Sequence, residues 1–318
     1  MADFFSLNVL QTALEVGLIY ALVAMALFVR FSILNIADLS TDGCFTLGCA
    51  VGAMLTIAGH PILAIFAAMA AGICSGYVTA FLQTRLGVES ILAGIIVNTG
   101  LYTINLGVMG FSSNVSIFGC DTVFTLTRSL LGDSSVSRIV LLAVIALIVC
   151  VALIRFFGTT LGLSIRATGD SPDMVSSSSI NPKFTITVGL CLANALTALA
   201  GCLIGQYNKT CDINLGTGMV TIALASLIIG EVSRFYNIEE AVIRGTLKNK
   251  NTAEARQVAM YLVRKLTNLS LPDIGKEFGR DHSTVSHSLK KVEQQLAAGT
   301  GSLPDNIRDI TANINSKL

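Results

Sequence analysis

Polar residues set within long apolar stretches are the first feature of this 318-residue sequence that could do chemistry. Carboxylates and carboxamides at such positions are costly in lipid, so they usually face a bundle interior or a water-filled cavity. One interpretation is a path for a polar solute, and the other is hydrogen bonding that holds neighbouring helices together. The candidate residues of the solute path are Asp38, Thr41, Asp42, Asn98, Tyr102, Asn105, Asn194 and Gln206.

The two interpretations differ in strength along the chain. Asn98, Tyr102 and Asn105 recur at spacings of four and three residues, which predicts one shared face of a helix. Both interpretations stay open for these three residues. Asn194 is isolated, and its position favours hydrogen bonding between helices.

A second candidate site is the polar stretch at 158–183, which separates two apolar runs. Pro172 suits the first position of a short helix that Asp170 or Ser171 would cap. A helix presented in this way across the membrane face can dock a partner protein. A solvated connector is the alternative interpretation.

A third candidate site lies in the polar tail, where residues 252–296 predict three helices. The second and third helices, joined by a turn with Gly279, form a helix-turn-helix pattern. The start of its last helix meets base edges in the major groove, where Arg and Thr read guanine and thymine. Residues suited to base contact are Arg280, His282, Ser283 and Thr284, and residues suited to phosphate contact are Arg244, Lys248, Lys250 and Arg256.

No group of residues predicts an enzyme. The sequence has no G-x-x-x-x-G-K phosphate loop and no Ser/His/Asp set on rigid elements. His282 and His287 lie five residues apart and the tail has no Cys, so we expect no zinc site. The prediction is a protein without catalytic residues, cofactor or bound metal.

The composition indicates where the elements that position these residues must lie. Hydrophobic residues make up 53% of the chain and charged residues 13%, with a mean hydropathy of +0.71. Soluble domains carry about 25% charged residues, so a purely soluble enzyme is excluded. Residues 1–235 have a net charge of −2 and all eight Cys, whereas residues 236–318 have a net charge of +3. This asymmetry predicts one unit in lipid and one in water.

The first part contains apolar runs long enough to cross a bilayer, which requires about 20 helical residues. The predicted spans are 9–29, 44–58, 61–84, 90–110, 138–157, 184–206 and 217–232. The fold class is therefore all-α, with a truncated transmembrane bundle of about seven spans and a small soluble helix-turn-helix domain. The predicted domains are 1–235 and 236–298, followed by a tail at 299–318 with a loop and a weak helix.

The basic residues predict the orientation, because Lys and Arg favour the cytoplasmic side. With 158–183 cytoplasmic, the inner side holds Arg30, Arg85, Arg155, Arg166, Lys183 and Arg234, and the outer side holds Arg128, Arg138 and Lys209. We expect a multi-pass protein of the cell (inner) membrane with a cytoplasmic C-terminal domain; the opposite orientation stays open. The scattered Cys residues suit packing between helices, with a Cys120–Cys211 bridge as the alternative.

Three stretches of the first part resemble the permease subunits of ATP-driven (ABC) importers of the branched-chain amino-acid, LivH-like group. They read LQTALEVGLIYALVAMALFVRFSILNIADLSTDGCFTLG, GLSIRATGDSPDMV and VGLCLANALTALAGCLIGQY, and the resemblance covers about 7–232. It implies a separate ABC ATPase subunit, an extracellular solute-binding protein, a second permease subunit in a homodimer or heterodimer, and transport of an amino acid or similar small polar solute. The residues it assigns to ATPase coupling are Arg166, Thr168, Gly169, Asp170, Asp173 and Met174.

The sequence departs from that group after the segment GMVTIALASLIIGE. Members of the group continue with further membrane spans, whereas this chain passes at 231–236 into a different sequence. The closing helices of the permease bundle are therefore expected to be missing.

The stretches ARQVAMYLVRKLTNLSLPDIGKEF and GRDHSTV resemble the C-terminal DNA-binding domain of the bacterial replication initiator DnaA, over about 238–296. The resemblance implies binding of double-stranded DNA with a DnaA-box-like sequence. Its contact residues would be Pro272, Asp281, His282, Ser283 and Thr284, with Lys248 and Arg256 in or near the basic loop. One Gly precedes Arg-Asp-His where the initiator commonly has two, which predicts a tighter turn.

Three functions follow from these observations. The first is a permease subunit that carries a DNA-binding domain. The second is a membrane-anchored, sequence-specific DNA-binding protein in which the spans act as the anchor. The third is a chimeric product of two truncated genes, which the abrupt junction and the absence of a Gly/Ser linker also fit.

Overall fold

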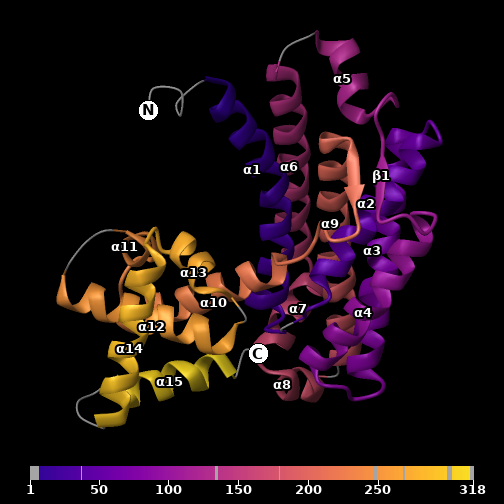
Figure 1. Cartoon of the computed structure of the whole chain (residues 1–318). Coiled ribbons are helices and arrows are strands. Elements are labelled where there is room, and N and C mark those ends of the chain that lie inside the picture. The colour runs from indigo at the N-terminus through magenta and orange to yellow at the C-terminus, as the bar shows by residue number, and fades with distance from the viewer. Residues whose placement is uncertain are drawn as a thin grey trace. The chain divides into compact units, whose positions relative to one another are not determined.

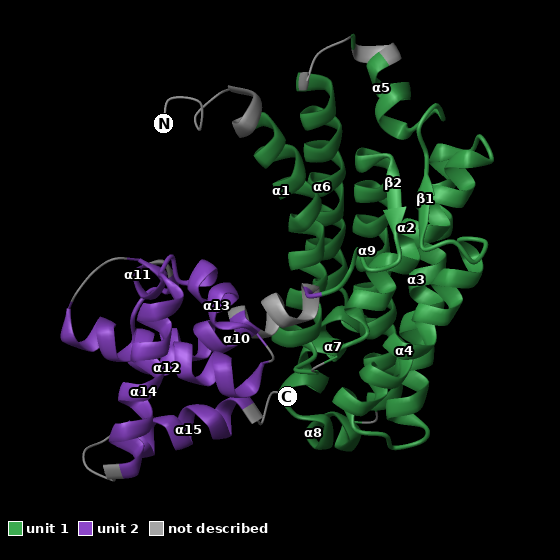
Figure 2. Ribbon diagram, viewed as in Figure 1, with its two compact units in different colours: residues 1–217 green, residues 218–318 purple. Residues whose placement is uncertain are grey.

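The computed structural model describes residues 7–36, 38–132, 135–178, 180–245, 249–267, 269–298 and 303–315. The chain divides into two compact units, Met1–Thr217 and Gly218–Leu318 (Figure 2). This boundary lies earlier than the 235/236 boundary expected from the sequence. The reason is that α10 (Met219–Tyr236) contributes to the hydrophobic core of the second unit.

The first unit is a helical bundle (Figure 1), which confirms the all-α class. Its elements are α1 (Leu7–Leu27), the π-helix η2 (Phe28–Ile33), α2 (Thr41–Ile57), α3 (Pro61–Thr84), α4 (Ser90–Val108), β1 (Asn114–Ser116), α5 (Val123–Leu131), α6 (Ser135–Phe157), α7 (Thr160–Asp170), α8 (Pro172–Ser177), α9 (Pro182–Asn208) and β2 (Thr210–Asp212). The two short strands pair antiparallel, with Val115 opposite Cys211. All eight cysteines are free thiols, so the alternative of a Cys120–Cys211 bridge is not realised.

Five helical stretches of the described residues are long and apolar enough to cross a membrane. They are Gln11–Ile33, Pro61–Thr84, Ser90–Val108, Val136–Phe157 and Pro182–Asn208, and Thr41–Ile57 is a shorter apolar helix. These six elements agree with the first six predicted spans. The helix at the seventh, α10, buries Ala225, Ile228, Ile229 and Val232 in the second unit, and this i, i+3, i+4, i+7 spacing forms one apolar stripe.

Helix α9 is the central element of the first unit and packs mainly on α3 and α2. Small residues allow the helices to approach closely, as the repeated glycines predict. A Cβ atom on Gly48 would lie 2.0 Å from the carbonyl oxygen of Ala198, and one on Gly72 would lie 2.5 Å from that of Asn194. Any larger residue would force α2 or α3 away from α9.

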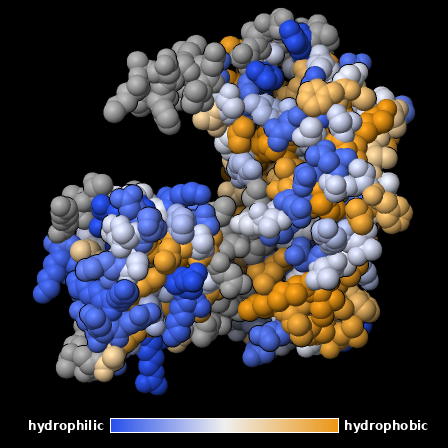
Figure 3. All heavy atoms as spheres, viewed as in Figure 1, coloured by the Kyte–Doolittle hydropathy of each residue, from blue (hydrophilic) through white to orange (hydrophobic). Residues whose placement is uncertain are grey.

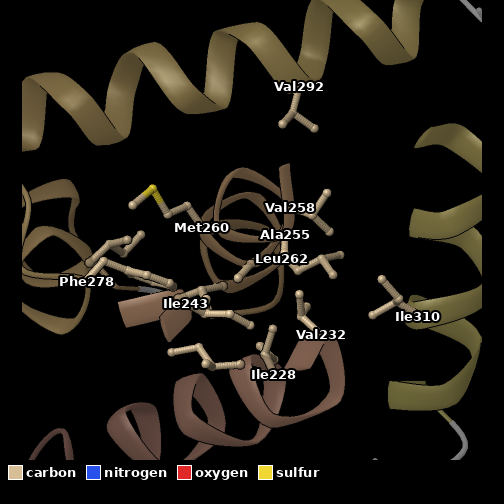
Figure 4. Close-up of a cluster of buried hydrophobic side chains, with 14 of the residues drawn as sticks. Ile228, Val232, Ile243, Ala255, Val258, Met260, Leu262, Phe278, Val292 and Ile310 are labelled. Atoms are coloured by element: carbon tan, nitrogen blue, oxygen red, sulfur yellow. The ribbon is translucent and has the colours of Figure 1, made fainter. Parts of the chain in front are cut away.

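The second unit contains α10, α11 (Glu240–Arg244), α12 (Lys250–Leu266), α13 (Leu271–Glu277), α14 (His282–Ala298) and α15 (Leu303–Asn315). Its core joins side chains from most of these helices, among them Val232, Val258, Phe278, Val292 and Ile310 (Figure 4). Helix α15 buries Leu303, Ile307, Ile310 and Ile314 in this core. The weak helix expected near the C-terminus is therefore an integral part of the unit.

The surfaces of the two units differ as the composition predicts. On the face in Figure 3, broad hydrophobic patches lie on the first unit, and mostly hydrophilic residues cover the second. On α6, Leu147 and Ile154 are 63% and 67% exposed. The exposure of many apolar side chains of this kind is unfavourable in water, whereas lipid accommodates them.

Candidate functional site

The first unit contains a fully buried charged cluster at the junction of η2, α2 and α9. The guanidinium of Arg30 lies 3.7 Å from the carboxylate of Asp38, and neither side chain is exposed. Arg30 also donates hydrogen bonds to Thr41 and to the side-chain oxygen of Asn194. We call these four residues the Arg30 cluster. Three of its members, Asp38, Thr41 and Asn194, belong to the solute path predicted from the sequence.

Local structure holds the carboxylate of Asp38 in this cluster. Its oxygens accept hydrogen bonds from the backbone N–H and the hydroxyl of Ser40, both at 2.8 Å. Ser40 directly precedes α2, whose N-terminal dipole also favours a negative charge. A buried ion is tolerated only when it is paired and hydrogen-bonded, and the carboxylate meets both conditions.

Arg30 belongs to this site although the sequence pattern did not predict it. It was counted among the cytoplasmic charges, but its side chain is fully buried on a π-helix. Single π-helical turns inside longer helices often mark functional sites. The available signal was a lone arginine at the end of a long apolar run, eight residues before Asp38.

Two N–H groups of the Arg30 cluster are not used by the described residues. The Nε atom of Arg30 and the Nδ2 atom of Asn194 are buried and have no hydrogen-bond partner there. Buried donors without partners are rare in proteins. A cation with adjacent N–H donors is chemically suited to a carboxylate.

The other candidate residues of the solute path are not members of the Arg30 cluster. Asn105 is buried and donates to the carbonyl oxygen of Gly43 at 3.0 Å, whereas Tyr102 is 51% exposed. A Cβ atom on Gly43 would lie 2.6 Å from the side-chain oxygen of Asn98. The expected polar face of α4 therefore divides, with the two asparagines against α2 and the tyrosine outward.

Two further candidates have structural hydrogen bonds. The amide of Gln206 accepts from the backbone N–H of Val123 at 3.0 Å and donates to the carbonyl of Pro61 at 3.2 Å, which ties α9 to α5 and α3. Asp42 is half-buried, and its carbonyl oxygen accepts from the Thr46 hydroxyl at 3.1 Å.

Helices α7 and α8 form the short helical segment predicted within 158–183. Ser171 caps α8 by accepting from the backbone N–H of Met174 at 3.4 Å, and Pro172 is at the first helical position. Of the two caps considered, Ser171 is the one in the structure. The predicted coupling residues with exposed side chains are Arg166, Asp170, Asp173 and Met174.

The remaining two coupling residues anchor this segment to the bundle. Thr168 is buried, and its hydroxyl lies 2.8 Å from that of Thr185 in α9. A Cβ atom on Gly169 would lie 1.9 Å from the carbonyl oxygen of Ile33 in η2. The segment therefore touches the same π-helix that carries Arg30.

In the second unit, α13 and α14 form the predicted helix-turn-helix. Ser270 caps α13 and accepts from the backbone N–H of Asp273 at 3.4 Å, with Pro272 in the first turn. Gly279 has a φ of +56°, which favours glycine, and it ends the helix. A Cβ atom on Gly275 would lie 2.4 Å from the carbonyl of Arg280, so the turn packs tightly on α13.

The predicted recognition residues are gathered at the start of α14. Asp281, His282, Ser283 and Thr284 are exposed there, and Pro272 is exposed at the start of α13. Arg280 is half-buried and donates to the carbonyl of Gly245 at 3.2 Å. The exposed first turn of α14 leaves its side chains accessible to a major groove.

The predicted basic contacts differ in accessibility, and Lys250 is the exposed one among those that the structure describes. Arg256 is 8% exposed and donates to the carbonyls of Ile243 and Val242, at 2.6 and 3.1 Å. Its burial, with the nearby charge of Arg280, lowers the pKa of the guanidinium. Arg244 pairs with Glu277 at 2.8 Å, and Lys248 lies outside the described residues.

Known proteins resemble the two parts of the chain separately. Residues 9–249 match the family described as branched-chain amino acid transport system / permease component. The tyrosine transport system permease protein of Clostridioides difficile (strain R20291) is 33% identical over 215 residues, 67% of this chain and 70% of that protein.

Residues 225–292 match the bacterial DnaA protein helix-turn-helix. The chromosomal replication initiator protein DnaA of Thermoanaerobacter sp. (strain X514) is 50% identical over 70 residues, 22% of this chain and 16% of that protein. That of Streptococcus thermophilus (strain ATCC BAA-491 / LMD-9) is 54% identical over 71 residues, with the same shares. The two family matches overlap at 225–249, which agrees with the place of α10 in the core of the second unit.

Proposed function

Because the chain belongs to the permease family of branched-chain amino acid transport systems and carries a DnaA-type helix-turn-helix domain, we propose that it is the membrane permease subunit of an ATP-driven importer. The solute is a small polar molecule of the amino-acid class. A separate ABC ATPase, an extracellular solute-binding protein and a second permease subunit complete the assembly. The chain itself catalyses no reaction.

The observation that carries this proposal is the contact of Gly169 with Ile33, which joins α7 to η2. An ATPase that docks on Arg166, Asp170, Asp173 and Met174 would push on α7. Since no side chain separates the two backbones at Gly169, the movement would pass directly to η2 and to Arg30. Coupling needs such an element with two arrangements that both sites can bias.

The Arg30 cluster gives this movement a consequence for transport. In the structure Arg30 pairs with Asp38, and displacement of η2 would expose the guanidinium and the unused N–H of Asn194. These groups would then bind the carboxylate of an amino acid as it passes. Tyrosine is the first solute to test, because the relative from C. difficile is named for it.

Co-purification tests this proposal. Full-length protein, extracted from its native membrane in mild detergent, is expected to elute with an ABC ATPase, and Asp170→Lys is expected to reduce the co-eluting ATPase severalfold. Asp121→Lys is the matched control, because Asp121 is equally exposed but precedes α5, outside α7 and α8. Equal recovery of the ATPase with Asp170→Lys would refute the docking site. An intact mass near 33.5 kDa verifies that both units belong to one polypeptide.

The second unit supports DNA binding as a second function, with the C-terminal domain on the cytoplasmic side of the cell membrane. The specific observation is the exposed first turn of α14 on a helix-turn-helix with its own hydrophobic core. The ligand is double-stranded DNA of DnaA-box-like sequence, which the chain would hold at the membrane.

A further inference from the structure

A pocket of about 270 Å³ lies where the end of α3 meets the start of α9, and no residue of the Arg30 cluster lines it. The lining residues that matter for its chemistry are Tyr77, Phe81, Arg85, Asn181, Lys183 and Phe184. Both helices are membrane-spanning candidates. Ends of spanning helices lie at the level of the lipid headgroups.

The polar side of this pocket is positively charged. Arg85 and Lys183 are exposed, no carboxylate lines the pocket, and neither cation forms an ion pair with the described residues. Arg85 caps the C-terminus of α3, and Lys183 is in the first turn of α9. The amide oxygen of Asn181 accepts from the backbone N–H of Lys183 at 3.0 Å, which fixes the start of α9. The two cations are therefore available to an anion from outside the chain.

The other side of the pocket is aromatic and faces outward. Tyr77, Phe81 and Phe184 are 56%, 44% and 55% exposed. The rings of Tyr77 and Phe81 lie 6.5 Å apart along α3. Aromatic side chains at this depth suit the boundary between headgroups and acyl chains. A free inorganic anion would contact only the two cations, whereas a phospholipid would contact both the cationic side and the aromatic side of the pocket.

We propose that this pocket binds the headgroup of one anionic phospholipid. Its phosphate lies between Arg85 and Lys183, and its acyl chains follow the exposed rings of Tyr77, Phe81 and Phe184. Basic pockets between membrane helices bind anionic headgroups in this way. Since Lys183 lies in the first turn of α9, the helix that follows α8, the lipid would also hold the junction of α8 and α9 at the membrane face.

Native mass spectrometry of the delipidated full-length protein tests the proposal. Phosphatidylglycerol is titrated against phosphatidylcholine, and one molecule of phosphatidylglycerol is expected to bind preferentially. Arg85→Gln and Lys183→Gln should each weaken binding about fivefold, and the double variant about twenty-five-fold. Arg155→Gln is the matched control, because Arg155 is an exposed cation in the last turn of α6 that does not line the pocket.

Three outcomes would overturn the proposal. They are equal binding of the two lipids, equal loss with Arg155→Gln, and displacement of the lipid by inorganic phosphate at the same concentration. Circular dichroism of each variant in detergent shows whether the fold is intact. If the double variant unfolds, the two single variants decide the result, since each leaves one cation in place.

Discussion

The guanidinium of Arg30 and the carboxylate of Asp38 lie 3.7 Å apart with no exposure to solvent. Removal of one partner of a buried pair leaves an uncompensated charge, whereas removal of both does not. Arg30→Leu is therefore expected to destabilise the protein by about 3–5 kcal/mol. Arg30→Leu with Asp38→Asn should recover part of that loss, because the introduced carboxamide oxygen still accepts from Ser40. Thermal unfolding followed by circular dichroism in detergent measures both, and equal destabilisation would contradict the pairing.

Gly169→Ala tests the contact between α7 and η2. The added Cβ would lie 1.9 Å from the carbonyl oxygen of Ile33, so one of the two backbones must shift. We expect a loss of about 1–3 kcal/mol in stability. We also expect solute uptake to fall in proteoliposomes that contain the complete assembly with its ATPase and solute-binding protein. Gly100→Ala is the control, because a Cβ there meets no atom within 4 Å and alanine favours the α4 helix. Unchanged uptake with Gly169→Ala would exclude this route of coupling.

His282→Ala tests base reading by the second unit. We expect the preference for DnaA-box duplex over random duplex to fall about tenfold, since a good base contact contributes about 1–3 kcal/mol of discrimination. The salt dependence should stay the same, because phosphate contacts are unaltered. Fluorescence anisotropy with the full-length protein in detergent measures both quantities. His287→Ala, which alters an exposed histidine further along α14, should change neither quantity. An equal loss of affinity for both duplexes in His282→Ala would argue against base reading.

The phenol of Tyr236 predicts a pH dependence of the second unit. Burial raises its pKa to about 12, and the neighbouring Glu254 carboxylate, which accepts its hydrogen bond at 3.2 Å, also raises it. The phenol is thus protonated in the folded chain when it has already ionised in the unfolded chain. Its contribution to stability is complete below pH 10 and is lost as the pH rises from 10 to 12.

Tyr236→Phe measures that contribution. Denaturant unfolding at pH 9 and pH 11.5 should show a smaller loss of stability between the two values in Tyr236→Phe than in the wild type. Tyr261→Phe is the control, because Tyr261 also has a partly buried ring that packs against the core of the second unit. Parallel losses in the wild type and Tyr236→Phe would show that the phenol is not the titrating group.

The sequence by itself determined those helices whose length or boundaries depend on neighbouring residues in the chain. The length of an apolar run sets a membrane helix, so the first six predicted spans correspond to helices. Pro172, with Asp170 or Ser171 as the cap, predicted where α8 begins, because a cap and a fixed φ act within one turn. The helix-turn-helix and the exposed start of α14 followed from the same kind of local signal.

Only the tertiary structure decided which distant residues meet. Arg30 and Asn194 are separated by 164 positions, and the contact of α9 with η2 brings them together. Arg256 has the charge expected of a DNA contact, yet in the fold its guanidinium donates hydrogen bonds to two carbonyls of α11. The place of α10 was also decided by the tertiary structure. An apolar stripe is compatible both with a helix that faces lipid and with a helix that packs in a soluble core, so the pattern alone does not distinguish them. Local sequence encodes helix boundaries, whereas burial and pairing depend on contacts that form only when the whole chain has packed.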